Sequence, residues 1–221
     1  MNIIIQARSS SVRLPRKVLI KINNLSILEH VINRVSKINQ KKTLFVATSI
    51  EREDDEIEKL LKKVQNVKLY RGDLSNVYQR FFDLVQENNL DSFIRISGDS
   101  PLIDYSIILK CYKIFLENDY DIVSNKYPRS FPIGQTVEVI NSKKFLESKK
   151  FVNSSYLEEH VTMQMYNNNF NYYNFLYEKD YSKLNLAIDC KDDLKKFSNL
   201  INYNKKNDLK LKEIIKFYEE N

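Results

Sequence analysis

Short apolar segments alternate with amphipathic helical patterns along the first 125 residues, and this alternation restricts the fold more than any other feature. The apolar segments, each long enough for one strand, are residues 2–6, 43–48, 67–70, 92–97 and 121–124. Between them, apolar residues recur at helical spacing over residues 26–38, 53–64, 75–89 and 104–117. Strands that alternate with helices pair in parallel and are covered on both faces. The sequence therefore predicts an α/β fold, with a mainly parallel sheet sandwiched by helices.

The pattern changes after residue 125. A segment with two prolines and a glycine leads into strand-like residues 136–140. The remaining predicted elements are a short helix from Ser142, a helix from Ser155 to about Tyr166, strands over 170–176 and 184–188, and helices near 191–204 and 209–220. Ser155 and Glu158 have the spacing of a capping box. We expect these elements to continue the same domain, because no linker or low-complexity tract separates them.

The composition excludes several classes of protein. The net charge of +6 is spread over lysine pairs rather than concentrated in a basic tract, which argues against a nucleic-acid partner. Two histidines and two well-separated cysteines argue against a zinc site or a disulfide, and favour the reduced thiols of a cytoplasmic protein. We expect neither a signal peptide nor a membrane span, since no apolar run approaches about 20 residues.

A basic loop follows the first predicted strand. The stretch Arg8-Ser-Ser-Ser-Val-Arg-Leu-Pro-Arg-Lys17 contains four cations and three serines. Backbone N–H groups, hydroxyls and cations together can cradle a polyphosphate, although a solvated basic loop has the same composition. Ligands of parallel sheets bind outside the carboxyl ends of the strands. That rule places four loops at one edge of the sheet, namely residues 7–17, 48–53, 71–76 and 98–101.

Two aspartates lie just past predicted strands. Asp99 follows the strand 92–97 after a glycine, and Asp189 comes directly after the strand 184–188. Either could cap a helix, but Asp104 is better placed to cap the helix that follows Asp99. Two carboxylates beside a phosphate loop fit a Mg²⁺ site, because Mg²⁺ takes one or two carboxylates together with phosphate oxygens.

Other motifs fail. Asp119-Tyr120-Asp121 matches the D-x-D pattern of metal-dependent sugar transferases, but it precedes a strand and should therefore lie at the opposite edge of the sheet. Neither a dinucleotide-binding fingerprint nor a P-loop is present in the sequence. The three glycines, Gly72, Gly98 and Gly134, point to loops in which the backbone needs special freedom.

Several motifs, in order along nearly the whole chain, resemble a known family. The matching stretches are IIQARSSSVRLPRKVL (4–19), FVATS (45–49), EDD (53–55), YRGD (70–73), NVYQR (76–80), RISGDSPLID (95–104), DIVSN (121–125), PIGQTVEV (132–139), EHVT (159–162) and LAIDCKDDL (186–194). They resemble the acylneuraminate cytidylyltransferases, and in particular the branch of spore-coat polysaccharide proteins similar to SpsF. The resemblance implies a nucleotide-diphospho-sugar transferase fold of the Rossmann-like GT-A type.

The resemblance also implies a role for individual residues. Arg8, Arg13 and Lys17 would hold the triphosphate. The backbone of Ala7 and the backbone and hydroxyls of Ser9 and Ser10 would bind it as well. Asp99 and Asp189 would hold Mg²⁺, and Arg8, Arg13, Lys17 and Asp99 would form the catalytic group. Thr48, Arg71 and Arg80 would lie near the base or ribose, and Arg129, Gln135, Glu138 and His160 would face the sugar. Residues 1–125 would bind the nucleotide, 126–180 would bind the sugar or form a homodimer, and 181–221 would add the second metal ligand.

Three positions depart from the family pattern. Ser10 and Arg16 stand where the first loop commonly has glycine, and Cys190 stands where threonine is usual. A serine at position 10 keeps a small size, whereas Arg16 is bulky and has no evident role. None of the three departures removes a charged residue, so we expect an active enzyme.

The implied activity is transfer of CMP from CTP to an acidic, keto-acid or nonulosonic-type sugar, with release of pyrophosphate, for polysaccharide biosynthesis. Two alternatives remain at this stage. One is a GT-A-type glycosyltransferase that uses a preformed nucleotide sugar, and the other is a non-catalytic nucleotide- or sugar-binding subunit. The preference for CTP depends on the resemblance alone, and the sugar itself cannot be read from the residues.

Overall fold

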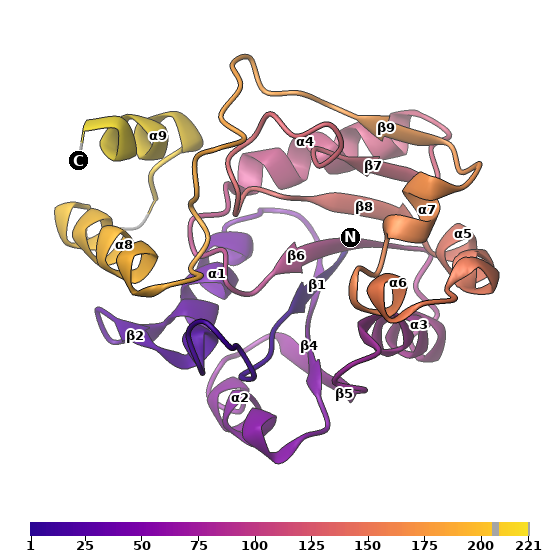
Figure 1. Cartoon of the computed structure of the whole chain (residues 1–221), viewed down its shortest axis with the longest axis horizontal. Helices are drawn as coiled ribbons and strands as arrows, with labels where there is room; N and C mark the ends of the chain where they lie inside the picture. Colours follow the sequence, from indigo (N-terminus) through magenta and orange to yellow (C-terminus); the bar gives the residue numbers. More distant parts are fainter. Residues whose placement is uncertain (205–207, 221) are drawn as a thin grey trace.

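The computed structural model describes residues 1–204 and 208–220. The described residues form a seven-stranded sheet and a small two-stranded hairpin (Figure 1). In spatial order, the strands of the large sheet are β5 (Val67–Gly72), β4 (Thr43–Ser49), β1 (Asn2–Gln6), β6 (Ser92–Ser97), β8 (Glu138–Asn141), β7 (Ile122–Ser124) and β9 (Tyr172–Asn174). The hairpin pairs β2 (Lys21–Ile22) with β3 (Leu25–Ser26).

The sheet is mainly parallel, which confirms the predicted fold class. Strands β5, β4, β1 and β6 all run in one direction. Strand β8 is antiparallel to both of its neighbours, β6 and β7. The physical reason is the connection from β7 to β8, which contains no helix and therefore cannot carry the chain back for a parallel crossover. Strand β9 then pairs in parallel with β7 and forms one edge of the sheet.

Helices cover both faces of the sheet. They are α1 (Ile27–Ser36), α2 (Asp55–Leu61), α3 (Val77–Glu87), α4 (Tyr105–Glu117), α5 (Ser142–Glu147), α6 (Ser155–Glu159), α7 (Met163–Asn167), α8 (Lys191–Tyr203) and α9 (Leu211–Glu220). The 3-10 helices are η1 (Lys17–Leu19), η2 (Arg52–Asp54) and η3 (Ser148–Phe151). No helix among the described residues is both long enough and apolar enough to span a bilayer.

Side-chain alternation along β1 divides the core into two layers. Ile3 and Ile5 pack with residues of α1, α2, α4, α8 and α9, whereas Ile4 packs with residues of α3, α5 and α7. All three isoleucines are fully buried, as expected for a central strand covered on both faces. Helix α1 begins where the sequence predicts, because Ser26 and Glu29 form the reciprocal contacts of a capping box.

Two predicted elements differ from the structure. The helix expected from Ser155 to Tyr166 is divided into α6 and α7, with Val161 between them in the left-handed region at φ 38°. The helix cap is the Ser154 hydroxyl, which accepts from the Leu157 N–H, and not Ser155. A β-branched residue strongly disfavours that backbone region, so local periodicity could not indicate the break.

The prediction of a strand over 184–188 is also wrong. Only an isolated bridge between Asn185 and Ile133 forms there, in the parallel sense. Strand β6 already pairs with β1 and β8 on its two sides, so it offers no further edge to this segment. The segment instead crosses near the carboxyl end of β6, where the Ile188 N–H donates to the Asp99 carbonyl at 2.8 Å.

Gly98 allows the close approach of β6 and β1 at this end of the sheet. A Cβ added at Gly98 would lie 2.9 Å from the Gln6 carbonyl oxygen and 3.0 Å from the Ala7 Cβ. We therefore expect Gly98→Ala to lower the free energy of unfolding by about 1–3 kcal/mol, as overpacking of a rigid site does. Urea unfolding would measure the change. An exposed residue of α3 offers a control, since Gln86→Ala should change stability by only about 0.5 kcal/mol, and equal stabilities for the two variants would contradict the prediction.

Candidate active site

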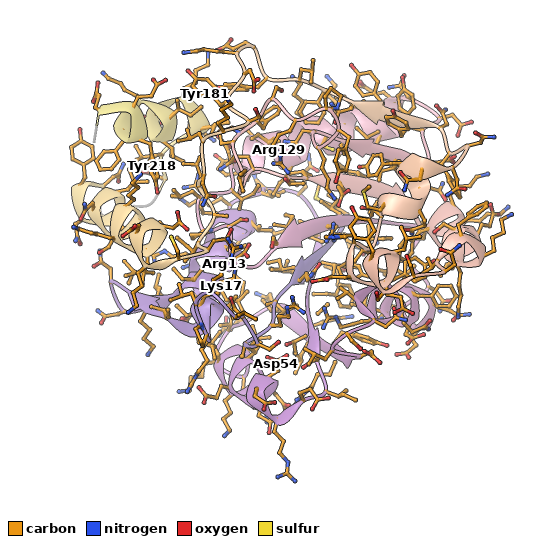
Figure 2. All side chains as sticks on the ribbon, viewed as in Figure 1. Arg13, Lys17, Asp54, Arg129, Tyr181 and Tyr218 are labelled. Atoms are coloured by element: carbon orange, nitrogen blue, oxygen red, sulfur yellow. The ribbon has the colours of Figure 1, made fainter. Side chains whose placement is uncertain are left out.

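Backbone hydrogen bonds to Ser9 close the loop after β1. The Ser9 carbonyl oxygen accepts hydrogen bonds from the backbone N–H groups of Ser11 and Arg16, both at 2.9 Å. Directly after this closure the chain enters η1, whose first residue is Lys17. A cavity of about 310 Å³ lies between the loop, the ends of β1 and β6, and Asp189. Figure 2 shows Arg13 and Lys17 near the centre of the molecule, on the loop that lines this cavity.

Lys17 lies between the two aspartates selected from the sequence. Its Nζ atom donates to Asp99 Oδ2 at 2.5 Å and to Asp189 Oδ1 at 2.9 Å. The Arg13 guanidinium lies 3.1 Å from the same Asp189 oxygen. Residues 13, 17, 99 and 189 therefore come together at one end of the sheet, although they belong to three segments that are far apart in the sequence.

Neither aspartate is needed to cap a helix. At the start of α4, Asp104 accepts from the Ser106 N–H at 2.9 Å. At the start of α8, Asp193 accepts from the N–H groups of Asp189 and Cys190, both at 2.9 Å. The helix termini thus have carboxylates of their own, and the side chains of Asp99 and Asp189 are left to face the cavity.

The D-x-D sequence at Asp119–Asp121 lies away from this site. It precedes β7, which runs in the same direction as β6 because both are antiparallel to β8. It therefore lies at the amino edge of the sheet, as predicted. There the Asp121 carboxylate accepts from the Asn171 N–H at 2.9 Å.

The charge of Lys17 is secured by its partners. Burial by itself lowers the pKa of a lysine, but the carboxylates of Asp99 and Asp189 outweigh that effect and raise the pKa of Lys17 above its usual value. Lys17 is therefore a cation throughout the neutral pH range. Because its positive charge lies between two negative ones, the aspartates can approach each other without uncompensated repulsion.

The donor set of the two aspartates fits a metal that arrives with a phosphate ligand. Within the described ranges, no group of three or more His, Cys, Asp or Glu side chains could hold a metal ion. Mg²⁺, however, commonly uses one or two carboxylates and completes its shell with water and phosphate oxygens. Asp99 and Asp189 each place one oxygen within hydrogen-bonding distance of a single atom, so they can share a cation.

Arg8 and Ser10 complete the loop side of the cavity. The Arg8 guanidinium lies 3.3 Å from the Glu159 carboxylate of α6, and both side chains are well exposed. An exposed pair of this kind contributes little to stability, so the guanidinium can exchange its partner for an anionic ligand at small cost.

The three residues expected near the base or ribose have different surroundings. Thr48 is fully buried at the end of β4. Arg71 is paired with the carboxylates of Asp55 and Glu58, at 2.7 and 2.8 Å. Arg80 is fully buried, and among the described residues its three guanidinium nitrogens have no hydrogen-bond partner. Burial lowers the pKa of Arg80 to about 10.

Glu138 is the centre of a buried polar cluster. It is 1% exposed, and Oε1 accepts from Thr162 at 2.8 Å and from the Tyr166 hydroxyl at 3.0 Å. The other oxygen, Oε2, accepts from Arg95 at 2.5 Å, and Lys126 lies 3.7 Å from Oε1. These contacts leave little of the carboxylate to touch a ligand directly.

The other residues expected at the sugar are not gathered around Glu138. Gln135 is buried, where it accepts from the Asp104 N–H and donates to the Leu102 carbonyl. These two hydrogen bonds give it a packing role. Arg129 donates to the Thr136 hydroxyl at 3.1 Å, and the partly exposed His160 ring packs edge-on against Tyr156.

Sequence reasoning missed three charged residues of this region. Arg95 and Lys126 contact Glu138, and Asp54 contacts the backbone of the loop at Ser9. A signal for Arg95 was present, since a lone cation interrupts the apolar strand SFIRIS. Asp54 gave no such signal, because it lies in a run of acidic residues that reads as the start of a helix.

The structure accounts for the unusual Arg16. Its φ is 59°, in the left-handed region that glycine adopts at little cost. Its guanidinium pairs with Glu56 of α2. Arg16 therefore ties the outside of the loop to α2, and its side chain is directed to a carboxylate rather than to the cavity.

Comparison with known proteins agrees with this geometry. The family model described as Cytidylyltransferase matches residues 2–221. The chain belongs to the cytidylyltransferase family. It is 30% identical to the spore coat polysaccharide biosynthesis protein SpsF of Bacillus subtilis over 74% of this chain and 69% of that protein.

Two further relatives extend the comparison. The chain is 32% identical to the 3-deoxy-manno-octulosonate cytidylyltransferase of Rickettsia canadensis, over 55% of this chain and 50% of that protein. Among solved structures, a cytidylyltransferase from Leptospira borgpetersenii superposes with a TM-score of 0.92 at 28% identity, and covers 99% of this chain and 93% of that one. The fold is that of the nucleotide-diphospho-sugar transferases, as expected.

The buried cluster predicts an acid dependence of stability. Burial raises the pKa of a carboxyl group, but Lys126, Arg95 and the hydrogen bonds to Glu138 outweigh it and lower its pKa from 4.5 to about 2. A depressed pKa stabilises the fold above the pKa of the unfolded chain, and this stability is lost as the pH falls from about 4.5 to about 2. The shift corresponds to roughly 3 kcal/mol.

We expect Glu138→Gln to be less stable than the wild type at pH 7, and to lose less stability as the pH falls from about 4.5 to about 2. Urea unfolding at each pH would measure both differences. Parallel pH profiles for the two proteins would contradict the prediction.

Proposed function

We propose that this chain is a CTP-dependent sugar cytidylyltransferase, which transfers CMP from CTP to an acidic sugar and releases pyrophosphate. The observation that carries the proposal is the placement of Lys17 between Asp99 and Asp189, beside Arg13, at the carboxyl edge of the sheet. Cations and paired carboxylates at one point are what a nucleoside triphosphate with a divalent metal requires.

The chemistry is an in-line displacement. An oxygen of the sugar hydroxyl bonds to the α-phosphorus while the bond from that phosphorus to the oxygen bridging the β-phosphate breaks. The hydroxyl proton passes to water, and pyrophosphate leaves with the electron pair of the broken bond. The protein contributes positioning and charge stabilisation rather than a covalent step.

In this reaction Arg8, Arg13 and Lys17 would bind the triphosphate, with Lys17 and Arg13 stabilising the charge that develops on pyrophosphate. The backbone and hydroxyl of Ser10 would border the same phosphates, whereas Ser9 is buried and its N–H and carbonyl already have partners in the protein. Asp99 and Asp189 would hold Mg²⁺, which when bound supplies charge neutralisation at the α-phosphate.

The base and ribose would lie toward the ends of β4 and β5. Arg80 is the strongest candidate there, because its guanidinium is buried without a hydrogen-bond partner among the described residues. Unpaired buried donors are costly, and a ligand that accepts from them recovers that cost. Thr48 and Arg71 would border the same region, although Arg71 would first have to exchange its carboxylate partners.

Charge balance supports an acidic acceptor. Arg95 and Lys126 both contact the single carboxylate of Glu138. Two cations to one carboxylate leave an excess of positive charge, to which Arg129 would add, and a sugar carboxylate would neutralise it. In this proposal Glu138 orients the cations, and His160 borders the acceptor. The named activities of the relatives, on 3-deoxy-manno-octulosonate and in spore coat polysaccharide biosynthesis, are consistent with such an acceptor.

A homodimer is part of the same proposal. Tyr156, Tyr172 and Tyr173 are exposed in the segment 126–180, and β9 leaves one edge of the sheet unpaired in the described chain. Exposed aromatic side chains beside an open strand edge favour association with a second copy.

Substitutions in the charge cluster test the proposal. We expect Lys17→Ala and Asp99→Asn each to lower turnover at least about a hundredfold, because each removes a charge that stabilises the transition state. The measurement is pyrophosphate release with Mg²⁺, each of the four nucleotides, and a panel of acidic sugars with their carboxyl-reduced counterparts. Circular dichroism and thermal unfolding would verify that the variants remain folded.

Two matched variants serve as controls. Lys21→Ala removes an exposed lysine from β2, and Asp119→Asn alters the D-x-D sequence at the opposite edge; both should keep wild-type turnover. Wild-type turnover in Lys17→Ala or Asp99→Asn would overturn the site. Release of a nucleoside diphosphate would support a glycosyltransferase instead, and CTP binding without turnover of any acceptor would support a binding subunit.

A further inference from the structure

Asp54 reaches from the start of α2 to the loop that follows β1. It is 1% exposed, and its Oδ1 atom accepts from the Ser9 N–H at 2.7 Å. Its Oδ2 atom accepts from the N–H and the hydroxyl of Ser49 at the end of β4, at 3.0 and 2.5 Å. One carboxylate thus joins the loop to the neighbouring strand. Figure 2 shows Asp54 at the end of the molecule where α2 lies.

The position of Asp54 in the sequence indicates a helix cap, but its contacts do not. It is the residue before α2, yet its side chain accepts no hydrogen bond from the first turn of that helix. A carboxylate in this position ordinarily caps the helix. Here both oxygens are instead directed toward Ser9 and Ser49, so the first turn of α2 does not account for this aspartate.

Ser9 is the residue on which the loop closes. Its carbonyl oxygen accepts from Ser11 and Arg16, and its N–H is the group that Asp54 holds. The closure determines where the chain returns at Lys17, and therefore where the Lys17 side chain meets Asp99 and Asp189. A shift at Ser9 would move the whole cationic loop.

The carboxylate is ionised in this setting. Burial raises the pKa of a carboxyl group, but the hydrogen bonds from Ser49 and Ser9 outweigh it and lower the pKa of Asp54. Hydrogen bonds to a buried anion are stronger than neutral ones, so this contact can hold the loop in one conformation. The same negative charge opposes the effect of burial on the pKa of Arg80, which burial lowers.

We propose that Asp54 is a positioning residue, which holds the loop 7–17 in the conformation that binds the triphosphate. It acts through Ser9 and touches no substrate. The proposal rests on the assignment of this loop to the triphosphate, and it adds to that assignment a residue of a different element.

The test compares Asp54→Asn with Ser49→Ala. The asparagine cannot accept hydrogen bonds at both positions, so the loop loses its ionic anchor. Ser49→Ala removes a hydrogen bond from the same carboxylate and leaves the Ser9 contact in place. Both variants disturb the same buried site, and thermal unfolding would establish that both are folded.

Two measurements report on the loop. Calorimetric binding of inorganic tripolyphosphate with Mg²⁺ should weaken at least about tenfold in Asp54→Asn, the effect of losing one charge-assisted hydrogen bond, and should change less than about twofold in Ser49→Ala. Trypsin cleavage after Arg13, whose side chain is 70% exposed, should be several times faster in Asp54→Asn than in the wild type or Ser49→Ala.

The outcomes separate this inference from the proposed function. Unchanged cleavage after Arg13 in folded Asp54→Asn, or an equal change in Ser49→Ala, would overturn the role of Asp54. A wild-type protein that binds neither tripolyphosphate nor CTP would instead overturn the assignment of the loop, while the cleavage rates would still decide whether Asp54 holds it in place.

Discussion

The cluster of Lys17, Asp99 and Asp189 joins three segments of the chain through their side chains. Each residue comes from a different segment, and two carboxylates at such short range would repel each other without the ammonium group between them. The partly buried position of Lys17 strengthens these interactions, because solvent screens them less. The three side chains also line the cavity, so the interactions that stabilise this part of the fold define the site as well.

The sheet makes this cluster possible. Parallel strands end at one edge, which brings the loop after β1 and the loop after β6 together. The third member, Asp189, comes from a segment that crosses this edge without joining the sheet. Its backbone is placed by the hydrogen bond from Ile188 to Asp99 and by the turn at Gly134. Gly134 has a φ of 91°, and a Cβ there would lie 2.8 Å from the Ala187 nitrogen, so glycine is required for the close contact.

Local patterns in the sequence predicted the strand–helix alternation, the parallel sheet and the edge at which Lys17 and Asp99 meet. These predictions were correct because periodicity and the residues at strand ends are local properties of the chain. Asp189 was placed correctly although the strand before it was wrong, since an extended segment and a strand have the same local pattern. The burial of Glu138 could not be predicted, because it depends on partners from β6, the segment after β7 and α7 that no local pattern reveals. The positive φ of Val161 likewise depends on tertiary packing rather than on propensity.

In the site, the loop cations have carboxylate partners within the protein. Arg8 pairs with Glu159, Arg13 with Asp189, and Lys17 with both aspartates of the cavity. In the proposed function, a triphosphate would therefore exchange partners with carboxylates rather than meet unpaired cations. Exchange at Arg13 or Lys17 would release a carboxylate of Asp99 or Asp189, which is the group that a divalent cation needs. Nucleotide and metal would consequently bind with positive coupling, because each removes the partner that the other must displace.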